Sequence, residues 1–480
     1  MEALDDVLVS RANVKQRRGR AGRCRPGVAF HLLTKHCHET ICEVSQQPEI
    51  RRVPLERLIL TIKALGYVPP AAAICARLLE PPDEAAVKQA VASLAGMDAL
   101  DLAGGEEALT ALGAHLVSLN LLIHFLLECG SSSLLIRSVW LQSCLPTDAR
   151  IGKFILLGAI FGVVDETLTI ASTLSHRSPF MAPFDKREQA DEAKRLFATG
   201  QSDHLAVLNA YMAFDRMGPA KYEFARENFL GIKTMQMIGG LKRQLLELLS
   251  DAGFVPKGLR AQTVEAMGRR AGGCDGVAIA LSRGLHAAAP AADESDAEKG
   301  ARGPGSALGS KDELLKALLC AALYPQIAAV ESKDDKGGNG AKGGKGGSPP
   351  KVVIREAGEK EPVAVAIHPS SVNARASSLS GGPPQQLLPP VLKGQSGSAI
   401  VDIVPGEGAE TVLTVDGWIK FRIPTRARAL IIDTRAQLTS LLQQKIASPE
   451  IELSSAGKGI LAAVTALLDT PPPYRHPNAQ

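Results

Sequence analysis

The residues best suited to chemistry form the octapeptide QRRGRAGR at residues 16–23. Phosphoryl transfer spreads negative charge over the oxygens of a terminal phosphate. Guanidinium groups suit that charge because they are planar, permanently charged and able to bind two oxygens at once. Seven Arg or Lys residues and no acid lie between Arg11 and Arg25, and small residues between the arginines allow close approach of the backbone. The pattern indicates a phosphate-binding segment; a generic basic patch or a localisation signal is the alternative.

A second group of polar residues follows directly and comprises His31, His36, Cys37, His38 and Cys42. Histidine and cysteine are common zinc ligands, but tetrahedral sites usually use two pairs of ligands at short, fixed spacing. No matching second pair appears downstream. We therefore predict no metal site and interpret these residues as polar side chains at the end of a strand.

Alternation of apolar and polar residues predicts a strand at residues 418–423. Its apolar positions suit a core, whereas Trp418, Lys420 and Arg422 share the other face. One aromatic ring beside two cations is a combination with which proteins bind single-stranded nucleic acid. A tryptophan that only anchors the fold is the alternative interpretation.

The basic, His/Cys and Trp/Lys/Arg groups are expected to lie on or near different helices and strands. The segment PGVAFHLLTK at residues 26–35 alternates apolar positions and predicts a short strand after the basic segment. From Leu55 to Leu65, apolar residues recur at three- and four-residue steps and predict a helix that is closed by Gly66.

Residues 145–255 keep helical patterning and predict a helix bundle. The clearest stripe of that bundle, on a helix expected to end near Gly253, comprises Met237, Leu241, Leu245 and Leu248. The compositions of residues 287–310 and 333–351 predict flexible insertions, and the Gly/Lys-rich second one is either a solvated linker or a contact for RNA phosphates.

Beyond Lys351 the hydrophobic period becomes two. The runs VVIR and VAVAI flank the turn-like EAGEKEP, and VLTV and WIKFRI flank Asp416-Gly417, which is a strong hairpin signal. A small β-rich domain is therefore expected after the helical ones. The proline-rich stretch between 374 and 395 lies where a barrel needs strands, so the barrel is expected to be incomplete.

The composition argues against several classes of protein. With 480 residues, 45% of them apolar, the chain can build several cores, and a net charge of +4 neither requires nor excludes nucleic acid. Eight cysteines without a CxxC pair favour reduced thiols in the cytosol or nucleus. The acidic start MEALDDVLVSR does not resemble a signal peptide, and no apolar run is long enough to span a bilayer. We expect a soluble intracellular protein without a membrane partner.

Several segments resemble the DEAH-box RNA helicases, in the order in which that family has them. SRANVKQRRGRAGRCRPGVAFHLLT is similar to motif VI and the next strand of the second RecA-like lobe, and PEIRRVPLERLILTIKALG to the entry of the winged helix. PTDARIGKFILLGAIFG and ENFLGIKTMQMIGGLKRQLLELLSDAGF resemble the helicase-associated bundle, and DGWIKF the tail of the RNA helicase A subgroup. The resemblance covers most of residues 7–450.

The resemblance implies roles for individual residues. Arg20 and Arg23 match the arginine fingers of the family, which would be its catalytic residues here, and Gln16 matches its glutamine at the phosphates. Gly19 belongs to the same nucleotide-binding segment. In the resembling family the loop at residues 368–373 belongs to the oligonucleotide-binding (OB) domain, so His368, Ser370 and Ser371 would meet RNA phosphate or ribose. Turn capping by Ser and Asn explains this loop equally well.

The family's first lobe, which holds ATP and Mg²⁺, has no counterpart in this sequence. GGKGGS at residues 343–348 lacks the spacing of a phosphate loop. Asp83-Glu84-Ala85 and Asp191-Glu192-Ala193 imitate the start of a DEAH box, but we interpret both as helix starts, where acids favour the helix dipole. The chain alone is therefore expected to bind no cofactor and to hydrolyse no ATP, and a truncated gene model or fragment is favoured over a genuine short paralogue.

The expected fold is mixed α/β and multidomain. The predicted boundaries are a remnant of the second RecA-like lobe at 1–48, a winged helix at 49–119, an atypical insertion at 120–144, a helicase-associated helical bundle at 145–256, a low-complexity connection at 257–310, an OB-like β-barrel domain at 311–426 with a disordered insertion at 333–351, and C-terminal helices at 427–480.

The function implied by the resemblance is ATP-driven unwinding or remodelling of RNA in the complete enzyme. The alternative is a non-catalytic RNA-binding or scaffold protein made only of helicase accessory domains. The expected partners are single-stranded or structured RNA and a protein activator or ribonucleoprotein, with no DNA specificity evident. The expected location is the cytoplasm or nucleus.

Overall fold

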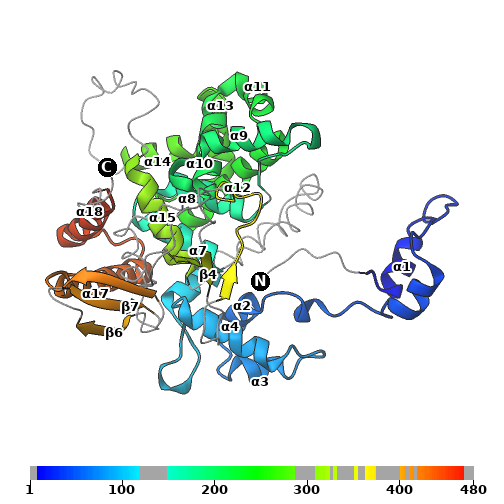
Figure 1. Ribbon diagram of the computed structural model, residues 1–480, viewed down its shortest axis with the longest axis horizontal. Coiled ribbons are helices and arrows are strands. Elements are labelled where there is room, and N and C mark those ends of the chain that lie inside the picture. The colour runs from blue at the N-terminus through cyan, green and yellow to red at the C-terminus, as the bar shows by residue number, and fades with distance from the viewer. Residues whose placement is uncertain are drawn as a thin grey trace, which may run out of the picture. The chain divides into compact units, whose positions relative to one another are not determined.

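The chain folds as a mixed, mostly helical protein, and its described residues form three small antiparallel sheets. It divides into two compact units, Met1–Ala92 and Ser93–Gln480 (Figure 1). The computed structural model describes residues 8–117, 149–176, 178–286, 309–324, 328–331, 351–354, 363–374, 400–405, 410–415 and 419–469. The predictions for residues 120–144, for the low-complexity parts 287–308 and 333–350, for the proline-rich residues 375–395 and for Trp418 lie outside these ranges.

The first unit consists of short helices. They are α1 (Arg11–Arg18), a π-helix (Cys37–Ile41), a 3₁₀ turn (Glu49–Arg51), α2 (Glu56–Ala64), α3 (Ala71–Cys75) and most of α4 (Glu84–Gly96). The helix predicted between Leu55 and Gly66 is confirmed as α2. Its apolar side chains Ile59 and Leu60 are almost fully buried, which is the burial that the periodic pattern requires.

The strand predicted at residues 26–35 does not form. Apart from the residues that lead into the π-helix, this segment has no regular structure, and Val28, Phe30 and Leu32 are 76%, 87% and 100% exposed. A strand is stable only when a neighbouring strand satisfies its backbone N–H and C=O groups. No strand is found among residues 8–92, so the apolar alternation has nothing to pair with.

One of the two predicted helix starts is confirmed. The helix α4 begins directly after Asp83, whose carbonyl oxygen accepts the N–H of Val87. Asp191, in contrast, lies in the middle of α9 (Arg187–Phe197), so that prediction is wrong. The helix has already begun after a 3₁₀ turn that Pro183 precedes.

The second unit opens with a small hairpin and is centred on a helical bundle. The hairpin pairs β1 (Leu100–Asp101) with β2 (Ala108–Leu109), and a helix over 111–117 follows. The helices of the bundle are α7 (Ala149–Ile160), α8 (Val164–Leu174), α9, α10 (Asp203–Arg216), α11 (Lys221–Glu227) and α12 (Ile232–Asp251). The bundle predicted at residues 145–255 is thus present.

Close packing holds the centre of the bundle together. The helix α8 packs against α7, α10 and α12, and α9 packs on α10. A Cβ atom at Gly158 would lie 2.2 Å from the hydroxyl of Thr167, so only glycine lets α7 and α8 approach this closely. The predicted stripe on α12 points inward at Leu241, Leu245 and Leu248, which are almost fully buried.

The low-complexity connection predicted at 257–310 is wrong in its first part, which folds. Residues 261–286 form α13 (Ala261–Arg270) and α14 (Val277–His286). Val264 and Val277 are almost fully buried, and α13 packs on α12 and α14. A few apolar anchors therefore suffice to order a segment rich in glycine and alanine.

Two three-stranded sheets follow α15 (Gly309–Leu323), which packs on α7. The first antiparallel sheet contains β3 (Ala328–Glu331), β4 (Lys351–Ile354) and β5 (Val363–Val365). The second contains β6 (Ile400–Pro405), β7 (Glu410–Val415) and β8 (Ile419–Pro424), also antiparallel. Both predicted hairpins are confirmed, because β4 pairs with β5 and β7 pairs with β8.

Two helices, α17 (Ala427–Ala447) and α18 (Ser455–Asp469), complete the described part of the chain. They pack against each other, and α18 also packs on α15. Among the described residues, no helix combines the length and the hydropathy needed to cross a membrane.

Candidate functional site

The arginine-rich segment includes α1 and the loop after it, and hydrogen bonds to Ser10 and to the segment after the π-helix hold the first turn of α1. The Ser10 hydroxyl accepts the N–H of Asn13 and caps the helix. Arg11 donates its backbone N–H to the carbonyl of Glu43 at 2.8 Å and its Nε–H to the carbonyl of Cys42 at 3.0 Å. Val14 and Cys42 are buried, so a small apolar contact supports the helix on one side.

The phosphate-binding candidates lie on the last turn of α1 and on the loop that follows it. Gln16 belongs to α1, Gly19 ends it, and Arg20 and Arg23 lie in the loop; all four are exposed. The loop folds back so closely that a Cβ atom at Gly27 would lie 2.9 Å from the carbonyl oxygen of Ala21. The backbone therefore holds the arginines at a turn instead of on a free tail.

The charge of this segment is not neutralised within the first unit. Among the described residues, Arg20 and Arg23 have no acidic partner. An exposed guanidinium without a carboxylate partner is available to an external anion, and several of them on one turn form a strongly positive surface. The described residues hold no group of three His, Cys, Asp or Glu side chains that could bind a metal ion.

The loop His368–Asn373 is fastened to the bundle. Ser371 Oγ donates to Asp203 Oδ2 at 2.5 Å, and the N–H of Val372 donates to Asp203 Oδ1 at 3.1 Å. Lys194 Nζ lies 2.7 Å from Asp203 Oδ1 and donates to the carbonyl of Ser370 at 2.6 Å. The hydroxyl of Ser371 is thus already engaged.

The other side chains of this loop form the local bonds of a turn. The N–H of Ser370 donates to His368 Nδ1 at 3.2 Å, and the N–H of Asn373 donates to Ser371 Oγ at 3.2 Å. These are the bonds that the turn-capping interpretation expects. His368 and Ser370 remain exposed.

Alanine at Ser371 is expected to lower the stability of the docked loop by about 1.5 kcal/mol, since the variant loses a hydrogen bond to a charged group. Faster hydrogen exchange of the backbone in residues 368–374 would measure this change. Alanine at the exposed neighbour Ser370, whose hydroxyl lies 2.8 Å from His368 Nδ1 within the same turn, is the control and should change the exchange less. Equal exchange in both variants would contradict the docking role of Ser371.

The RNA candidates on the last sheet are placed only in part. Lys420 lies opposite Thr414, and Arg422 opposite Val412, in the register of β7 and β8. Trp418 is outside the described residues. The role of these three residues in RNA binding stays a prediction.

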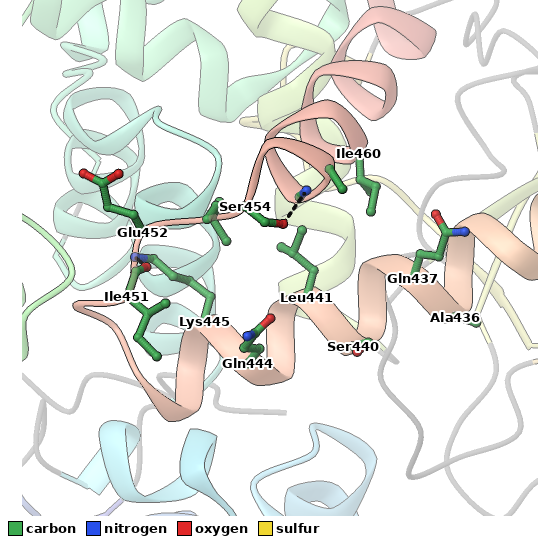
Figure 2. Close-up of a pocket in the computed structure, with 13 residues that line it drawn as sticks. Ala436, Gln437, Ser440, Leu441, Gln444, Lys445, Ile451, Glu452, Ser454 and Ile460 are labelled. Carbon is green, nitrogen blue, oxygen red and sulfur yellow. Dashed lines mark hydrogen bonds between the residues drawn. The ribbon is translucent and has the colours of Figure 1, made fainter.

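A groove lies between α17 and α18 near the turn that joins them (Figure 2). It has a volume of about 520 Å³, and Leu441, Lys445, Ile451 and Ile460 are among the residues that line it. Lys445 donates to the carbonyls of Pro449 and Ile451, so its ammonium fixes the turn. Among the described lining residues no set of groups suited to acid–base or nucleophilic chemistry converges.

Sequence reasoning missed a buried charged cluster in the bundle, which we call the Lys242 cluster and define as Lys242, Asp165, Asp275, Tyr211 and Asp215. Lys242 is 2% exposed, and its Nζ lies 2.7 Å from both Asp165 Oδ1 and Asp275 Oδ2. The Tyr211 hydroxyl donates to Asp275 Oδ2 at 3.0 Å, and the N–H of Asp275 donates to Asp215 Oδ1 at 2.8 Å.

The cluster ties together α8, α10, α12 and the turn before α14. The available signal in the sequence was a lysine directly beside the apolar stripe of α12, one position after Leu241. Such a lysine usually extends to solvent, so the pattern alone does not distinguish it. The two carboxylates that pair with it directly, on Asp165 and Asp275, are 33 or more residues away, and periodicity carries no information about such distant pairing.

The cluster has one cation and three carboxyl groups, and the pKa values reflect that imbalance. Burial favours the neutral form of Asp275, but Lys242 and two hydrogen bonds hold the pKa of Asp275 below its ordinary value. Burial, together with the negative charge of Asp275, raises the pKa of Asp165, and Lys242 opposes this rise without cancelling it. Burial, and then the negative charge of Asp275, raise the pKa of Asp215 to about 6.

Asparagine at Asp215 is expected to stabilise the bundle at neutral pH. A carboxyl group whose folded pKa is raised contributes stability below its unfolded pKa near 4 and loses it as pH rises through about 6. The asparagine side chain would remain neutral, and its oxygen could still accept the N–H of Asp275. Because Asp215 is only partly buried, solvent screening reduces the gain to about 1 kcal/mol at pH 7.5.

Urea unfolding of the Asp215→Asn variant and the unchanged chain at pH 4, 6 and 7.5 measures this effect. The difference between the two proteins should vanish near pH 4 and grow with pH. A difference in stability that is independent of pH would contradict the assignment.

Two protein-family models match parts of this chain. Residues 148–207 match the family described as the helicase associated domain (HA2), ratchet-like, and residues 411–470 match the C-terminal domain in RNA helicases. The first match covers α7, α8 and α9 and extends into α10. The second covers β7, β8, α17 and α18.

Several curated proteins are similar to almost the whole chain. DHX57 of Mus musculus, named as a putative ATP-dependent RNA helicase, is 35% identical over 98% of this chain and 32% of its own length. The ATP-dependent RNA helicase DExH1 of Arabidopsis thaliana is 30% identical over 96% of this chain and 39% of its own length. The ATP-dependent DNA/RNA helicase DHX36 of Homo sapiens is 31% identical over 96% and 39%. The chain thus spans between about a third and two fifths of these relatives.

Proposed function

Because this chain belongs to the DEAH-box RNA helicases and corresponds to their C-terminal portion, we propose that it forms the RNA-engaging part of an ATP-dependent RNA helicase. The chain spans only about a third to two fifths of these relatives, so ATP hydrolysis and RNA unwinding are proposed for a longer protein that includes this chain. The observation that carries the proposal is the exposed arginine turn after α1, whose guanidiniums have no acidic partner among the described residues.

In this proposal, Arg20 and Arg23 meet the terminal phosphate of an ATP that another part of the protein holds. Their exposure and positive charge fit a phosphate, and Gln16 and Gly19 lie beside them on the same turn. ATP and Mg²⁺ need a phosphate loop and acidic ligands in addition, and the described residues of this chain include no group suited to the metal. We propose that the chain supplies one side of the nucleotide site.

The accessory domains are proposed to guide the RNA. We assign a winged helix to residues 49–119 and an OB-like domain to 311–426. The helices α2 to α4 with the β1–β2 hairpin support the first assignment, and the two three-stranded sheets support the second. The proposed RNA contacts are His368 and Ser370 on the docked loop and Lys420 and Arg422 on the last sheet. Trp418, which precedes that strand in the sequence, is proposed with them.

The compartment and the partners are inferred from chemistry. Cysteines without disulfides suit a reducing compartment, and the six cysteines among the described residues form no disulfide, which supports the cytoplasm or nucleus. The partner that we propose besides RNA is a protein activator or a ribonucleoprotein. One relative is named as a DNA/RNA helicase, so single-stranded DNA belongs in any binding assay.

Reversal of the two strand cations, in a Lys420→Glu, Arg422→Glu double variant, is expected to weaken binding of single-stranded RNA at least about tenfold at low salt. Each lost phosphate contact also lowers the slope of log affinity against log salt by about 1. Fluorescence anisotropy with a labelled oligonucleotide measures both quantities.

The matched control for that experiment is Arg428→Glu, on the exposed start of α17. It should change the affinity far less than the double variant. Equal losses in the two proteins would remove the strand from the RNA path. Hydrolysis of ATP by the 480-residue chain alone would contradict the proposal that the nucleotide is held elsewhere.

A further inference from the structure

Two cysteines lie one helical turn apart in the first unit, and the proposed helicase function uses neither of them. The π-helix Cys37–Ile41 separates them, and the N–H of Cys42 donates to the carbonyl of Cys37 at 2.8 Å. A hydrogen bond between residues i and i+5 defines the π-helix, and it places the two residues one above the other. Successive turns of a helix lie about 5 Å apart, and this spacing is within the Cα–Cα range that a disulfide bridges.

The two thiols lie side by side but differ in access. The Cys37 thiol is near enough to that of Cys42 to influence the pKa of the buried thiol. Cys37 is partly exposed, whereas Cys42 is 2% exposed. Burial raises the pKa of the Cys42 thiol, the neighbouring Cys37 adds to this, and Arg11 opposes it. An oxidant in solution therefore meets Cys37 first.

The segment after Cys42 anchors the helix that carries the arginine turn. The side chain of Arg11 donates its Nε–H to the carbonyl of Cys42. The backbone N–H groups of Arg11 and Ala12 donate to the carbonyls of Glu43 and Val44, respectively. The redox state of the two cysteines consequently affects the stability of the first turn of α1.

We propose that Cys37 and Cys42 form a reversible thiol–disulfide pair, closed by a small disulfide oxidant such as oxidised glutathione, and that closure stabilises the anchor of α1. The Cys37 thiolate attacks one glutathione sulfur, forms a mixed disulfide and releases one glutathione. The Cys42 thiolate then attacks the Cys37 sulfur, forms the Cys37–Cys42 bond and releases the second glutathione. Two cysteine thiols are oxidised while one glutathione disulfide is reduced to two thiols. A reduced thiol pool reverses both steps.

The test treats the 480-residue chain with oxidised glutathione, unfolds it, blocks free thiols with N-ethylmaleimide and digests it with trypsin. Residues 36–51 form one tryptic peptide that contains both cysteines and no other. This peptide should be about 2 Da lighter than its fully reduced form and carry no maleimide, because two hydrogens are lost in closing the bond. Cys24, which is exposed and lies on a separate tryptic peptide, is the internal control and should carry glutathione only.

Two variants separate the steps. Cys42→Ser should leave Cys37 as the glutathione adduct, and Cys37→Ser should leave Cys42 free to react with maleimide after unfolding. The second variant changes the more exposed residue and keeps the test valid if loss of buried Cys42 prevents folding. A wild-type chain in which Cys37 keeps glutathione and Cys42 reacts with maleimide would overturn the proposal.

Hydrogen exchange tests the link to α1. The backbone amides of Arg11 and Ala12 should exchange more slowly in the oxidised chain than in the reduced one, and they should not change in Cys37→Ser under the same oxidant. Unchanged exchange in the oxidised wild-type chain would overturn the anchoring part of the proposal. None of these measurements depends on ATP or RNA, so their outcome is distinct from that of the proposed function.

Discussion

Alanine at Arg23 is expected to lower RNA-stimulated ATP hydrolysis about a thousandfold, the scale on which arginine fingers act, while RNA affinity stays unchanged. The assay requires a longer protein that places a nucleotide-binding lobe ahead of this chain. Arg23 lies exposed on the loop after α1 without an acidic partner among the described residues, so its removal breaks no ion pair there. The loss should therefore appear in turnover and not in folding.

The matched control for Arg23→Ala is Arg25→Ala. Arg25 is exposed on the same loop, and its replacement changes the net charge equally, but it lies outside the pattern QRRGRAGR. Initial-rate measurements at saturating RNA should show near-normal turnover for the control. If the two variants lose ATP hydrolysis equally, the loss comes from the lower positive charge of the loop, and the assignment of Arg23 as a finger fails. If both keep near-normal turnover, the assignment fails as well.

Local patterns were enough to predict the elements whose stability is local. The three- and four-residue steps from Leu55 predicted α2 because that helix buries one face against its own unit. The dipeptide Asp416-Gly417 predicted the β7–β8 pairing because the turn sets the register of the strands next to it. In both cases neighbouring residues contain the whole physical cause.

Patterns failed where the cause lies far away in the chain or outside it. Residues 26–35 alternate correctly for a strand, but a strand depends on a partner, and no strand is found among residues 8–92. The glycine-rich region from 257 looked like a connection, yet Val264 and Val277 order it by packing into the bundle. Periodicity cannot reveal such distant contacts.

In the candidate site, too, local features could be predicted from the sequence and long-range contacts could not. The chemistry of residues 16–23 is legible from the sequence because charge and small size are local properties. The hydrogen bonds of Ser371 with Asp203 and of Lys242 with Asp275 join residues 168 and 33 positions apart, respectively. They arise only after the chain has folded, so the sequence offered Ser371 as a free hydroxyl and gave no reason to select Lys242.

Methionine at Lys242 is expected to destabilise the bundle by about 3–5 kcal/mol. Methionine keeps much of the volume but removes the cation, which leaves Asp165 and Asp275 buried without their shared partner. Removal of one member of a buried charged pair usually costs this much, because the remaining charge can neither return to water nor be neutralised by its partner. Urea unfolding followed by circular dichroism of the helices measures the loss.

The pH dependence and a control separate this cause from a simple loss of packing. Without Lys242, the folded pKa of Asp275 should rise above its unfolded value, and that of Asp165, which is already raised, should rise further. The variant therefore loses stability as pH rises from about 4 toward neutrality. Its deficit should therefore be smaller at pH 5 than at pH 8. Lys257→Met removes an exposed cation 2.6 Å from Glu450 and should cost less than about 1 kcal/mol at either pH. A Lys242→Met protein that matches this control, or whose deficit does not depend on pH, would show that the cluster does not hold the bundle together through charge.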